Sequence, residues 1–409
     1  MRLVGQPAHP TRARAAAIPA LGLLISALLA PACAPPPARP VPSPCTLSRA
    51  PAPGPLADKR AGLQTQAPSS EALVALARVY VEEARISGDS GFYTLADQAC
   101  ACALETAPGD PAVRLTQAEV WLQLHRFAEA EATASEIFDA EPTVFAAQVL
   151  GDARAELGRL DAAAGAYQFA ADRAPGPGLY DRIAYLRWSW GDYPGAMELQ
   201  ARAIAASPPG SESWAWSMTM TAWWSAMHGQ PATGLDTVLS VRPDYGPALF
   251  HRARIRLHNG DAVGARTDLA RAPTSFEARR LAHELGDDGD LRAACALDRR
   301  GCAAWLLPTE PSAAYALLVE EQRERQDAAT LAALAWAERE TGRDGAPHAE
   351  AAKATGTIDP RTLLFIGLTL DQAEILERAL GSGPGLLPSE VALAKAALAT
   401  REPLPARTP

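Results

Sequence analysis

The chain has 409 residues, more than one compact core requires, so a large domain, several domains or an extended repeat array can all be accommodated. Aromatic residues make up only 6% and alanine is abundant, which favours helix over strand. The net charge of −9, without any block of lysine and arginine, argues against nucleic acid as a partner and against docking on an anionic membrane surface.

The first 32 residues have the composition of an export signal. Arg2, Arg12 and Arg14 form a positively charged flank, an apolar run follows from residue 15 to residue 30, and small residues come after it. The apolar run is shorter than the ~20 residues that span a bilayer as a helix. Residues 1–32 are therefore predicted to be a signal peptide, and the protein to be exported; a membrane anchor or a misassigned start site is the alternative.

The end of this segment, Leu29-Ala30-Pro31-Ala32-Cys33, resembles a bacterial lipoprotein signal, in which the cysteine becomes the lipidated first residue. That family prefers leucine three residues before the cysteine, where this chain has Ala30, with Leu29 one position further back. The resemblance implies a lipid on Cys33 and a protein anchored in the periplasm or on the cell surface. Simple secretion after cleavage behind Ala32 is the alternative, because Ala30 and Ala32 also form an A-x-A site.

A proline- and alanine-rich segment follows the signal. Residues 33–68 have a proline every few positions and no apolar periodicity, so they cannot form a core and are predicted to be a disordered, extended linker.

The next part of the chain is repetitive. The segments 127–142, 160–175 and 193–208 each have a bulky residue, an alanine three positions later and a closing proline. The alanines are Ala130, Ala163 and Ala196, and an upstream segment that ends at Pro108 fits the same frame. Alanine allows two helices to approach closely, glycine takes the turn between them, and proline ends the second helix.

This 33–34-residue period resembles the tetratricopeptide repeat. The resemblance implies an all-α fold, a right-handed α-solenoid of antiparallel helix hairpins with a general role in protein–protein interaction. The array is predicted to cover residues 69–273, with shorter second helices after residue 210. Residues 274–401 are predicted to form irregular hairpins, one of them around Gly286, followed by repeat-like hairpins and a capping helix. Residues 402–409 are predicted to be a disordered tail.

No constellation of catalytic, cofactor-binding or metal-binding residues emerges. The seven histidines include no H-E-x-x-H pair, and no G-x-S-x-G, phosphate-binding loop or dinucleotide fingerprint is present. Neither an enzymatic activity nor a cofactor is therefore expected. Cys295 and Cys302 lie too far apart for a bond within one continuous helix, so they form a disulfide only if Arg300-Gly301 turns the chain; two buried thiols are the alternative.

Aromatic residues cluster in one stretch of the array, since six of the nine tryptophans lie between residues 180 and 224. The repeat frame assigns five aromatic residues to first-helix positions that line the concave groove in the tetratricopeptide family: Phe145, Tyr185, Trp188, Trp216 and Trp223. Such a groove can bind a peptide, and packing between the helices is the alternative reading of the same rings.

These observations favour a binding scaffold that is exported to the cell envelope and holds a protein or peptide on its concave face. A structural subunit of an envelope complex, packing through its outer faces, is the second hypothesis. An enzyme with an unrecognised site is the third.

Overall fold

A computed structural model describes residues 58, 69–87, 91–272, 275–287, 289–295 and 298–400. The predicted signal peptide, Cys33, the linker apart from Asp58, and the tail 402–409 lie outside the described residues. The described residues contain α-helices and one 3-10 turn but no strand, which confirms the all-α fold. No helix among them is both long and apolar enough to cross a membrane.

Paired helices form the first part of the array. The pairs are α2 (Ser70–Ser87) with α3 (Gly91–Thr106), α4 (Pro111–Gln123) with α5 (Phe127–Ala140), α6 (Val144–Glu156) with α7 (Leu160–Ala171), α8 (Pro177–Ser189) with α9 (Tyr193–Ala206), α10 (Glu212–Met227) with α11 (Gly234–Val241), and α12 (Gly246–His258) with α13 (Ala262–Leu269). From α4 onward the first helices begin 33 to 35 residues apart, close to the predicted period, whereas α2 begins 41 residues before α4. The second helices α11 and α13 have only 8 residues each.

The alanines at the predicted helix crossings lie in the core. Ala130, Ala163 and Ala196 are each 0% exposed, because a methyl group is the largest side chain that fits where paired helices cross. Proline occupies the first turn of α4 and α8, where a missing backbone N–H costs no hydrogen bond. The sequence pattern thus predicts both the pairing and the helix starts.

The remainder of the chain is less regular. Its elements are α14 (Phe276–Glu284), α15 (Leu291–Ala294), α16 (Arg299–Leu306), α17 (Pro311–Glu324), α18 (Ala328–Glu340), α19 (Ala346–Ala354), α20 (Pro360–Leu370), α21 (Ala373–Leu380), the 3-10 turn η1 (Gly383–Gly385) and α22 (Pro388–Ala399). Around Gly286 the partner of α14 is the four-residue helix α15, which is much shorter than the helices of the regular pairs.

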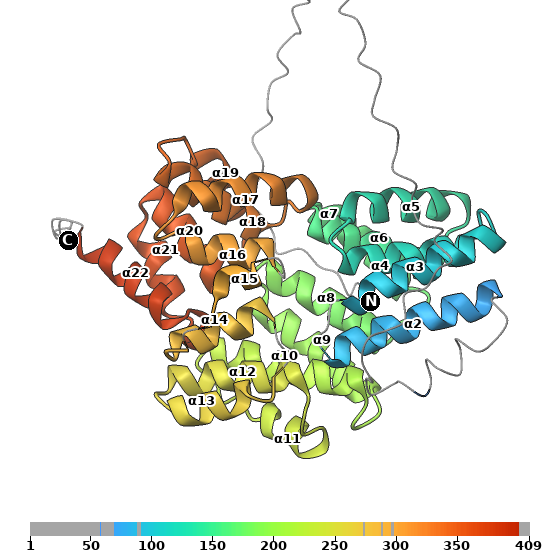
Figure 1. The fold of residues 1–409 in the computed structure, drawn as a ribbon, viewed down its shortest axis with the longest axis horizontal. Helices are drawn as coiled ribbons and strands as arrows, with labels where there is room; N and C mark the ends of the chain where they lie inside the picture. The colour runs from blue at the N-terminus through green and yellow to red at the C-terminus, as the bar shows by residue number, and fades with distance from the viewer. Residues whose placement is uncertain are drawn as a thin grey trace, which may run out of the picture.

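The superhelix closes on itself after about one turn. In Figure 1 the N-terminal pairs lie on the right, α10 to α13 at the bottom and α14 to α22 on the left, so that α7 comes next to α17 and α18 at the top. The turn between α6 and α7 meets the link between α17 and α18, where the Gln326 amide donates to the Glu156 carbonyl (3.2 Å). The first and last thirds of the described chain are therefore in direct contact.

Two glycines with positive φ make this closure sterically feasible. A Cβ on Gly158 (φ +71°) would lie 2.5 Å from the carbonyl oxygen of Gln326. A Cβ on Gly191 (φ +80°) would lie 2.8 Å from the carbonyl oxygen of Gly356. Both glycines turn the chain between paired helices, and both also leave room for the backbone of the opposite end of the solenoid.

Candidate binding site

A cavity of about 390 Å³ lies inside the closed superhelix. Its walls come mainly from the first helix of each pair, namely α6, α8, α10 and α12 on one side and α16, α18 and α20 on the other, with residues from α14. Its volume falls within the range of small-ligand sites, ~300–1,000 Å³. We call this hollow the central cavity.

One wall of the central cavity is aromatic and apolar. It contains Tyr185 and Trp188 from α8, together with Trp223 and Trp224 from α10. Tyr185 is 50% exposed, whereas Trp188 and Trp223 are only 7% and 6% exposed. Trp188 stacks on Trp224 with ring centroids 5.6 Å apart, and its Nε1 has no hydrogen-bond partner among the described residues. This wall offers apolar area, while the unpartnered Trp188 N–H is itself buried.

The opposite wall is charged, but its charges are paired. Asp327 accepts from Arg300 at 2.5 Å, and Glu277 accepts from both Nη atoms of Arg361 at 2.9 and 3.2 Å. Burial disfavours ionisation of Glu277, but Arg361 and Arg280 outweigh it and lower the pKa of this carboxyl group to about 2. These carboxylates therefore remain ionised at neutral pH.

Two more carboxylates of this wall cap helices. Asp298 accepts from the Gly301 amide at the start of α16, and Asp359 accepts from the Thr362 amide at the start of α20. Each side chain satisfies a backbone N–H that has no partner within its helix. The third Asp of this wall, Asp327, also caps α18.

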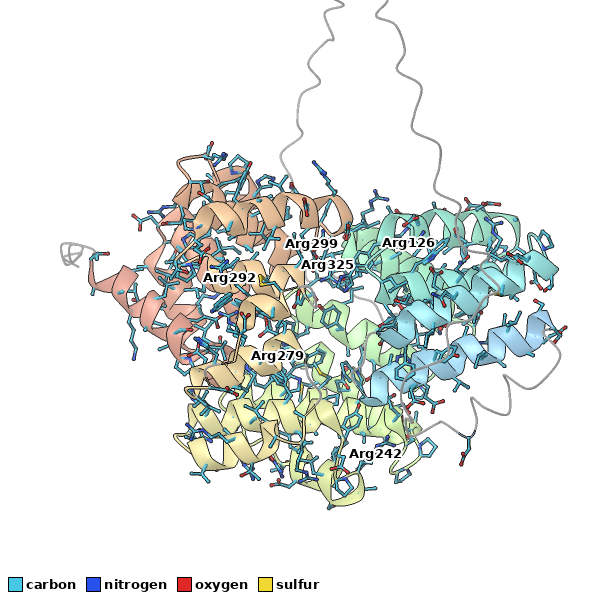
Figure 2. The ribbon with its side chains drawn as sticks, in the orientation of Figure 1. Arg126, Arg242, Arg279, Arg292, Arg299 and Arg325 are labelled. Carbon is cyan, nitrogen blue, oxygen red and sulfur yellow. A yellow bond between two sulfur atoms is a disulfide. The ribbon has the colours of Figure 1, made fainter. Side chains whose placement is uncertain are left out.

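An ion pair ties the two sides of the cavity together. Nε of Arg325, from the link before α18, lies 3.0 Å from a carboxylate oxygen of Glu156 at the end of α6. Figure 2 labels Arg325 where the N-terminal pairs meet the C-terminal helices. Burial raises the pKa of Glu156, and Arg325 opposes that rise.

On the side of α8 and α10, the cavity lining also includes Arg254 of α12, which makes no ion pair within the described residues. Its Nη2 donates to the carbonyls of Pro384 and Gly385 (3.2 and 2.8 Å), and its guanidinium lies 4.6 Å from the ring centroid of Trp223. Burial and the neighbouring Arg361 lower the pKa of Arg254 to about 10, so it remains a cation. It joins α12 to η1 across the superhelix.

A second cavity, of about 460 Å³, lies at the other end of α6. Phe145 lines it, with charged residues from α2, α4 and α10: Arg78, Glu82, Arg85, Glu119 and Glu212. Val81 and Thr116 complete the lining. We call this hollow the N-terminal cavity.

Four of the five aromatic residues predicted for one groove are thus distributed over two cavities. Tyr185, Trp188 and Trp223 line the central cavity, and Phe145 lines the N-terminal cavity. Trp216 lines neither cavity and is 39% exposed on α10. Trp188 and Trp223 also belong to the core, so the two interpretations of these rings, groove and packing, apply to the same side chains.

Sequence reasoning missed the charged wall. Asp298, Asp327 and Asp359 carry a local signal, since each stands directly before a helix, and Asp is a preferred N-cap. That signal predicts a cap but not a cavity wall. Arg300 and Arg361 carry no local signal, because only the closure of the superhelix brings them opposite α8 and α10, whereas Arg254 lies on α12, the next first helix of the array.

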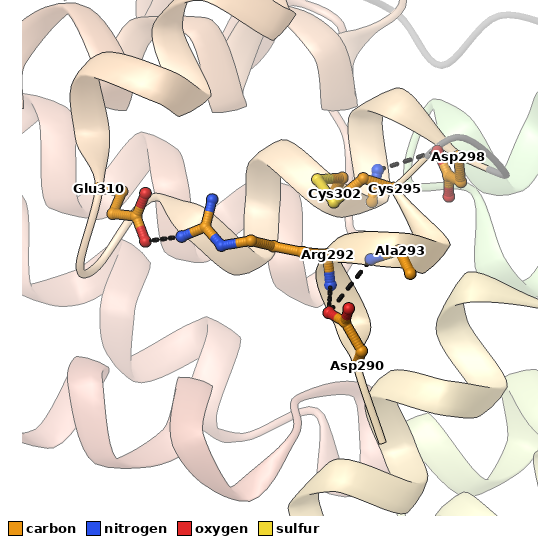
Figure 3. The surroundings of a disulfide bond; sticks show 8 residues. Asp290, Arg292, Ala293, Cys295, Asp298, Cys302 and Glu310 are labelled. Atoms are coloured by element: carbon orange, nitrogen blue, oxygen red, sulfur yellow. Dashed lines mark hydrogen bonds and ion pairs between the residues drawn. A yellow bond between two sulfur atoms is a disulfide. The ribbon is translucent and has the colours of Figure 1, made fainter. Parts of the chain in front are cut away.

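The structure joins Cys295 and Cys302 by a disulfide, with their Cα atoms 5.0 Å apart (Figure 3). The turn that permits this disulfide is not at Arg300-Gly301, because both residues lie within α16. The chain instead leaves α15 after Ala294 and begins α16 at Arg299, so the two cysteines are not on one continuous helix. The disulfide closes a short loop that includes the wall residues Asp298 and Arg300.

Polar contacts hold α15 in place beside the disulfide. Asp290 accepts from the amides of Arg292 and Ala293 (2.9 and 3.2 Å), and Arg292 forms an ion pair with Glu310 (Figure 3). The other two cysteines of the described residues, Cys100 and Cys102, are buried, and burial raises the pKa of Cys100 to about 12.

No profile of a known protein family matches this chain, and no curated protein matches it. Among solved structures it is similar to a tetratricopeptide repeat protein from Parabacteroides merdae ATCC 43184, at 12% identity and a TM-score of 0.38, covering 66% of this chain and 98% of that one. It is also similar to yeast Tom70, at 13% identity and a TM-score of 0.34, covering 84% and 95%. A third similar structure is the APC/C hetero-tetramer Cut9-Hcn1, at 13% identity and a TM-score of 0.30, covering 85% and 79%. By the pairing, period and buried alanines of its own helices, the chain is a solenoid of tetratricopeptide-like repeats.

Proposed function

We propose that the chain is a non-enzymatic scaffold that binds a peptide segment of a protein partner on its inner face. The observation that carries this proposal is the central cavity, which is lined by the half-exposed Tyr185 together with the buried rings of Trp188 and Trp223. Rigid aromatic side chains in a hollow of this kind provide much of the binding energy in peptide and protein recognition.

Export to the cell envelope, with a lipid on Cys33, belongs to the same proposal. The N-terminal sequence supports it, and so does the disulfide between Cys295 and Cys302, because disulfides persist mainly in oxidising compartments. A lipid on the first mature residue would tether the solenoid through the linker 33–68. Labelling of cells with an alkyne-bearing fatty acid tests this part: we expect the wild type to be labelled and Cys33→Ala to be unlabelled.

Affinity capture from the envelope fraction tests peptide binding. We expect Tyr185→Ala to retain at least ten-fold less of the partner than the wild type, with an unchanged melting temperature, because Tyr185 is half exposed and lines the cavity. Val263→Ala is the matched control, because Val263 is a 75% exposed apolar residue on the second helix α13 and lines neither cavity. Equal capture by wild type and Tyr185→Ala would exclude the central cavity as the binding site.

A further inference from the structure

The central cavity contains hydrogen-bond donors that no described residue uses. Both hydrogen bonds of the Arg254 side chain come from Nη2, so its Nη1 has no acceptor within the described residues. The phenol hydroxyl of Tyr185, which lines the same cavity, also has no partner in the described part of the chain. The carboxylates of the cavity, in contrast, are already engaged by arginines or by helix-cap amides. The cavity therefore suits a ligand that brings acceptors and few donors.

A neutral acceptor fits this lining better than an anion does. The lining contains three arginines and five carboxylates, which are Arg254, Arg300, Arg361, Glu156, Glu277, Asp298, Asp327 and Asp359. Because the acidic groups outnumber the basic ones, the cavity as a whole disfavours a carboxylate of a ligand, whereas a backbone carbonyl carries no net charge.

Proline-rich chain meets both conditions. A proline residue has a carbonyl but no N–H, and the polyproline II helix leaves its carbonyls without internal hydrogen bonds. The accessible apolar surface of the cavity comes from Leu160, Tyr185 and Met220, which are only partly buried. Pyrrolidine rings can pack against such a surface, as they do in aromatic-lined grooves that bind proline-rich segments.

The chain itself contains a segment of this kind. Residues 51–55, in the linker and outside the described residues, read Pro-Ala-Pro-Gly-Pro and carry no charged side chain. The linker 33–68 around them has four basic residues and one acidic residue, although the whole chain has a net charge of −9. The linker is therefore a basic segment next to an acidic fold, and long-range attraction favours its return to the solenoid.

The central cavity lies within reach of residues 51–55. Fifteen positions separate Pro55 from Ser70 at the start of α2, and an extended chain of that length spans up to about 50 Å. Arg78 of α2 and Glu212 of α10 line the N-terminal cavity together, and Trp223 of the central cavity is eleven residues further along α10, about 16 Å away. Arg78 itself is eight residues, about 12 Å, from the start of α2.

From this arrangement we infer that residues 51–55 of the chain's own linker occupy the central cavity and that a partner peptide must displace them. Because this segment is tethered, its effective concentration is on the order of millimolar, so even weak docking fills the cavity. This inference rests on the proposed function, since it takes the central cavity as the peptide site, and it adds an autoinhibitory contact to that site.

Limited digestion of the full-length protein with trypsin, followed by mass spectrometry, tests it. The bond after Arg49 lies two residues before Pro51, and the bond after Arg60 lies five residues beyond Pro55. A synthetic peptide of residues 34–68 gives the rate of each cleavage in free chain. We expect the protein to be cut after Arg49 at least ten-fold more slowly than the peptide, because only the undocked fraction is cleaved, and after Arg60 at nearly the rate of the peptide.

Two pairs of variants locate the contact. Tyr185→Ala should restore the peptide's rate after Arg49, whereas Val263→Ala, at an exposed residue outside both cavities, should keep the protection. Pro53→Ala/Pro55→Ala should also restore that rate, because it weakens the docked segment. Pro42→Ala/Pro44→Ala makes the same change in the other proline block of the linker and should keep the protection.

Four results would overturn the inference. They are cleavage after Arg49 at the rate of the peptide in the wild type, protection that survives Tyr185→Ala, protection that depends on Pro42 and Pro44 but not on Pro53 and Pro55, and protection that weakens on dilution, which would make a second copy the source of the segment. Tyr185-dependent capture of a partner would still support the proposed function in each case. If Tyr185→Ala changes neither the protection nor the capture, both proposals fail.

Discussion

The pairs α4 to α9 and the region α14 to α22 form one superhelix by different means. In the first region, alanines with no exposed surface allow the paired helices to approach closely, and the ion pairs include surface contacts such as Arg202 with Glu198, whose side chain is 57% exposed. In the second, the Arg280–Glu390 pair joins α14 to α22 with side chains only 4% and 5% exposed, and a disulfide joins α15 to α16. A regular repeat needs mainly small side chains at the crossings, whereas irregular helices depend on specific long-range polar contacts.

The largest loss of stability is expected from Glu390→Ala in the second region. Glu390 pairs with Arg280 and also lies 2.7 Å from Arg361, so its removal leaves buried guanidinium groups without this carboxylate. Breaking a buried pair of this kind costs about 3–5 kcal/mol. Urea unfolding followed by circular dichroism measures the loss. Glu198→Ala, in the exposed pair of the first region, is the control and should lower the free energy of unfolding by less than about 1 kcal/mol. Similar small losses for both variants would show that ion pairs contribute equally to stability in the two regions.

The second-largest loss of stability is expected in the aromatic core of the first region. Trp188→Ala should lower the free energy of unfolding by about 3 kcal/mol, because Trp188 is 7% exposed and stacks on Trp224, and its removal leaves a void. Trp216→Ala, at a 39% exposed ring one helix away, should change stability by no more than about 0.5 kcal/mol. Thermal melts of both variants measure the contrast. An unchanged melting temperature in Trp188→Ala would make Trp188 a groove residue with no part in the core.

Reduction of the disulfide should cause a third, smaller loss of stability. Reduction of Cys295–Cys302 should lower the stability of the wild type by about 2.5 kcal/mol, the loop-closure entropy of a cross-link this short. Differential scanning fluorimetry with and without reductant measures the shift in melting temperature. The double variant Cys295→Ala/Cys302→Ala should melt at the temperature of the reduced wild type and should not respond to reductant; a response of the double variant would assign the effect to another cysteine.

The smallest expected loss of stability depends on pH and arises at His251 on α12, between the two regions. His251 stacks on Trp223, and burial lowers the pKa of its imidazole to about 3. The unfolded chain, with a histidine pKa of about 6.5, binds this proton and the folded chain does not, so stability is lost as the pH falls from about 6.5 towards 3. Between pH 7 and pH 5 the loss should be about 2 kcal/mol.

His251→Gln checks this assignment. Urea unfolding at pH 7 and pH 5 should show a smaller loss in the variant than in the wild type, by about the contribution of one histidine. Part of the dependence remains in the variant, because burial and Arg325 also lower the pKa of His125, to about 4. Identical pH dependence in wild type and variant would contradict the burial of a neutral imidazole at this position.

The aromatic residues of the candidate site were predictable only in part. The repeat frame assigned Tyr185 and Trp188 to one face of α8, and both line the central cavity because residues three apart in a helix share a face. The same frame placed Phe145 and Trp216 in that groove, but Phe145 lines the N-terminal cavity and Trp216 lies between the two. A repeat pattern defines a residue's face on its helix, while its position along the groove depends on how strongly the solenoid curves.

The helix pairs, their period and their turns follow from the amino-acid sequence, because proline, glycine and alanine act within a few residues of their own position. The closure of the superhelix, the charged wall and the pairing of Cys295 with Cys302 depend instead on how distant segments pack together. Glu156 and Arg325, or Arg280 and Glu390, stand far apart in the chain and have no common local pattern. Their contact depends on the sum of many small rotations between successive helix pairs, and no single segment of the sequence encodes that sum.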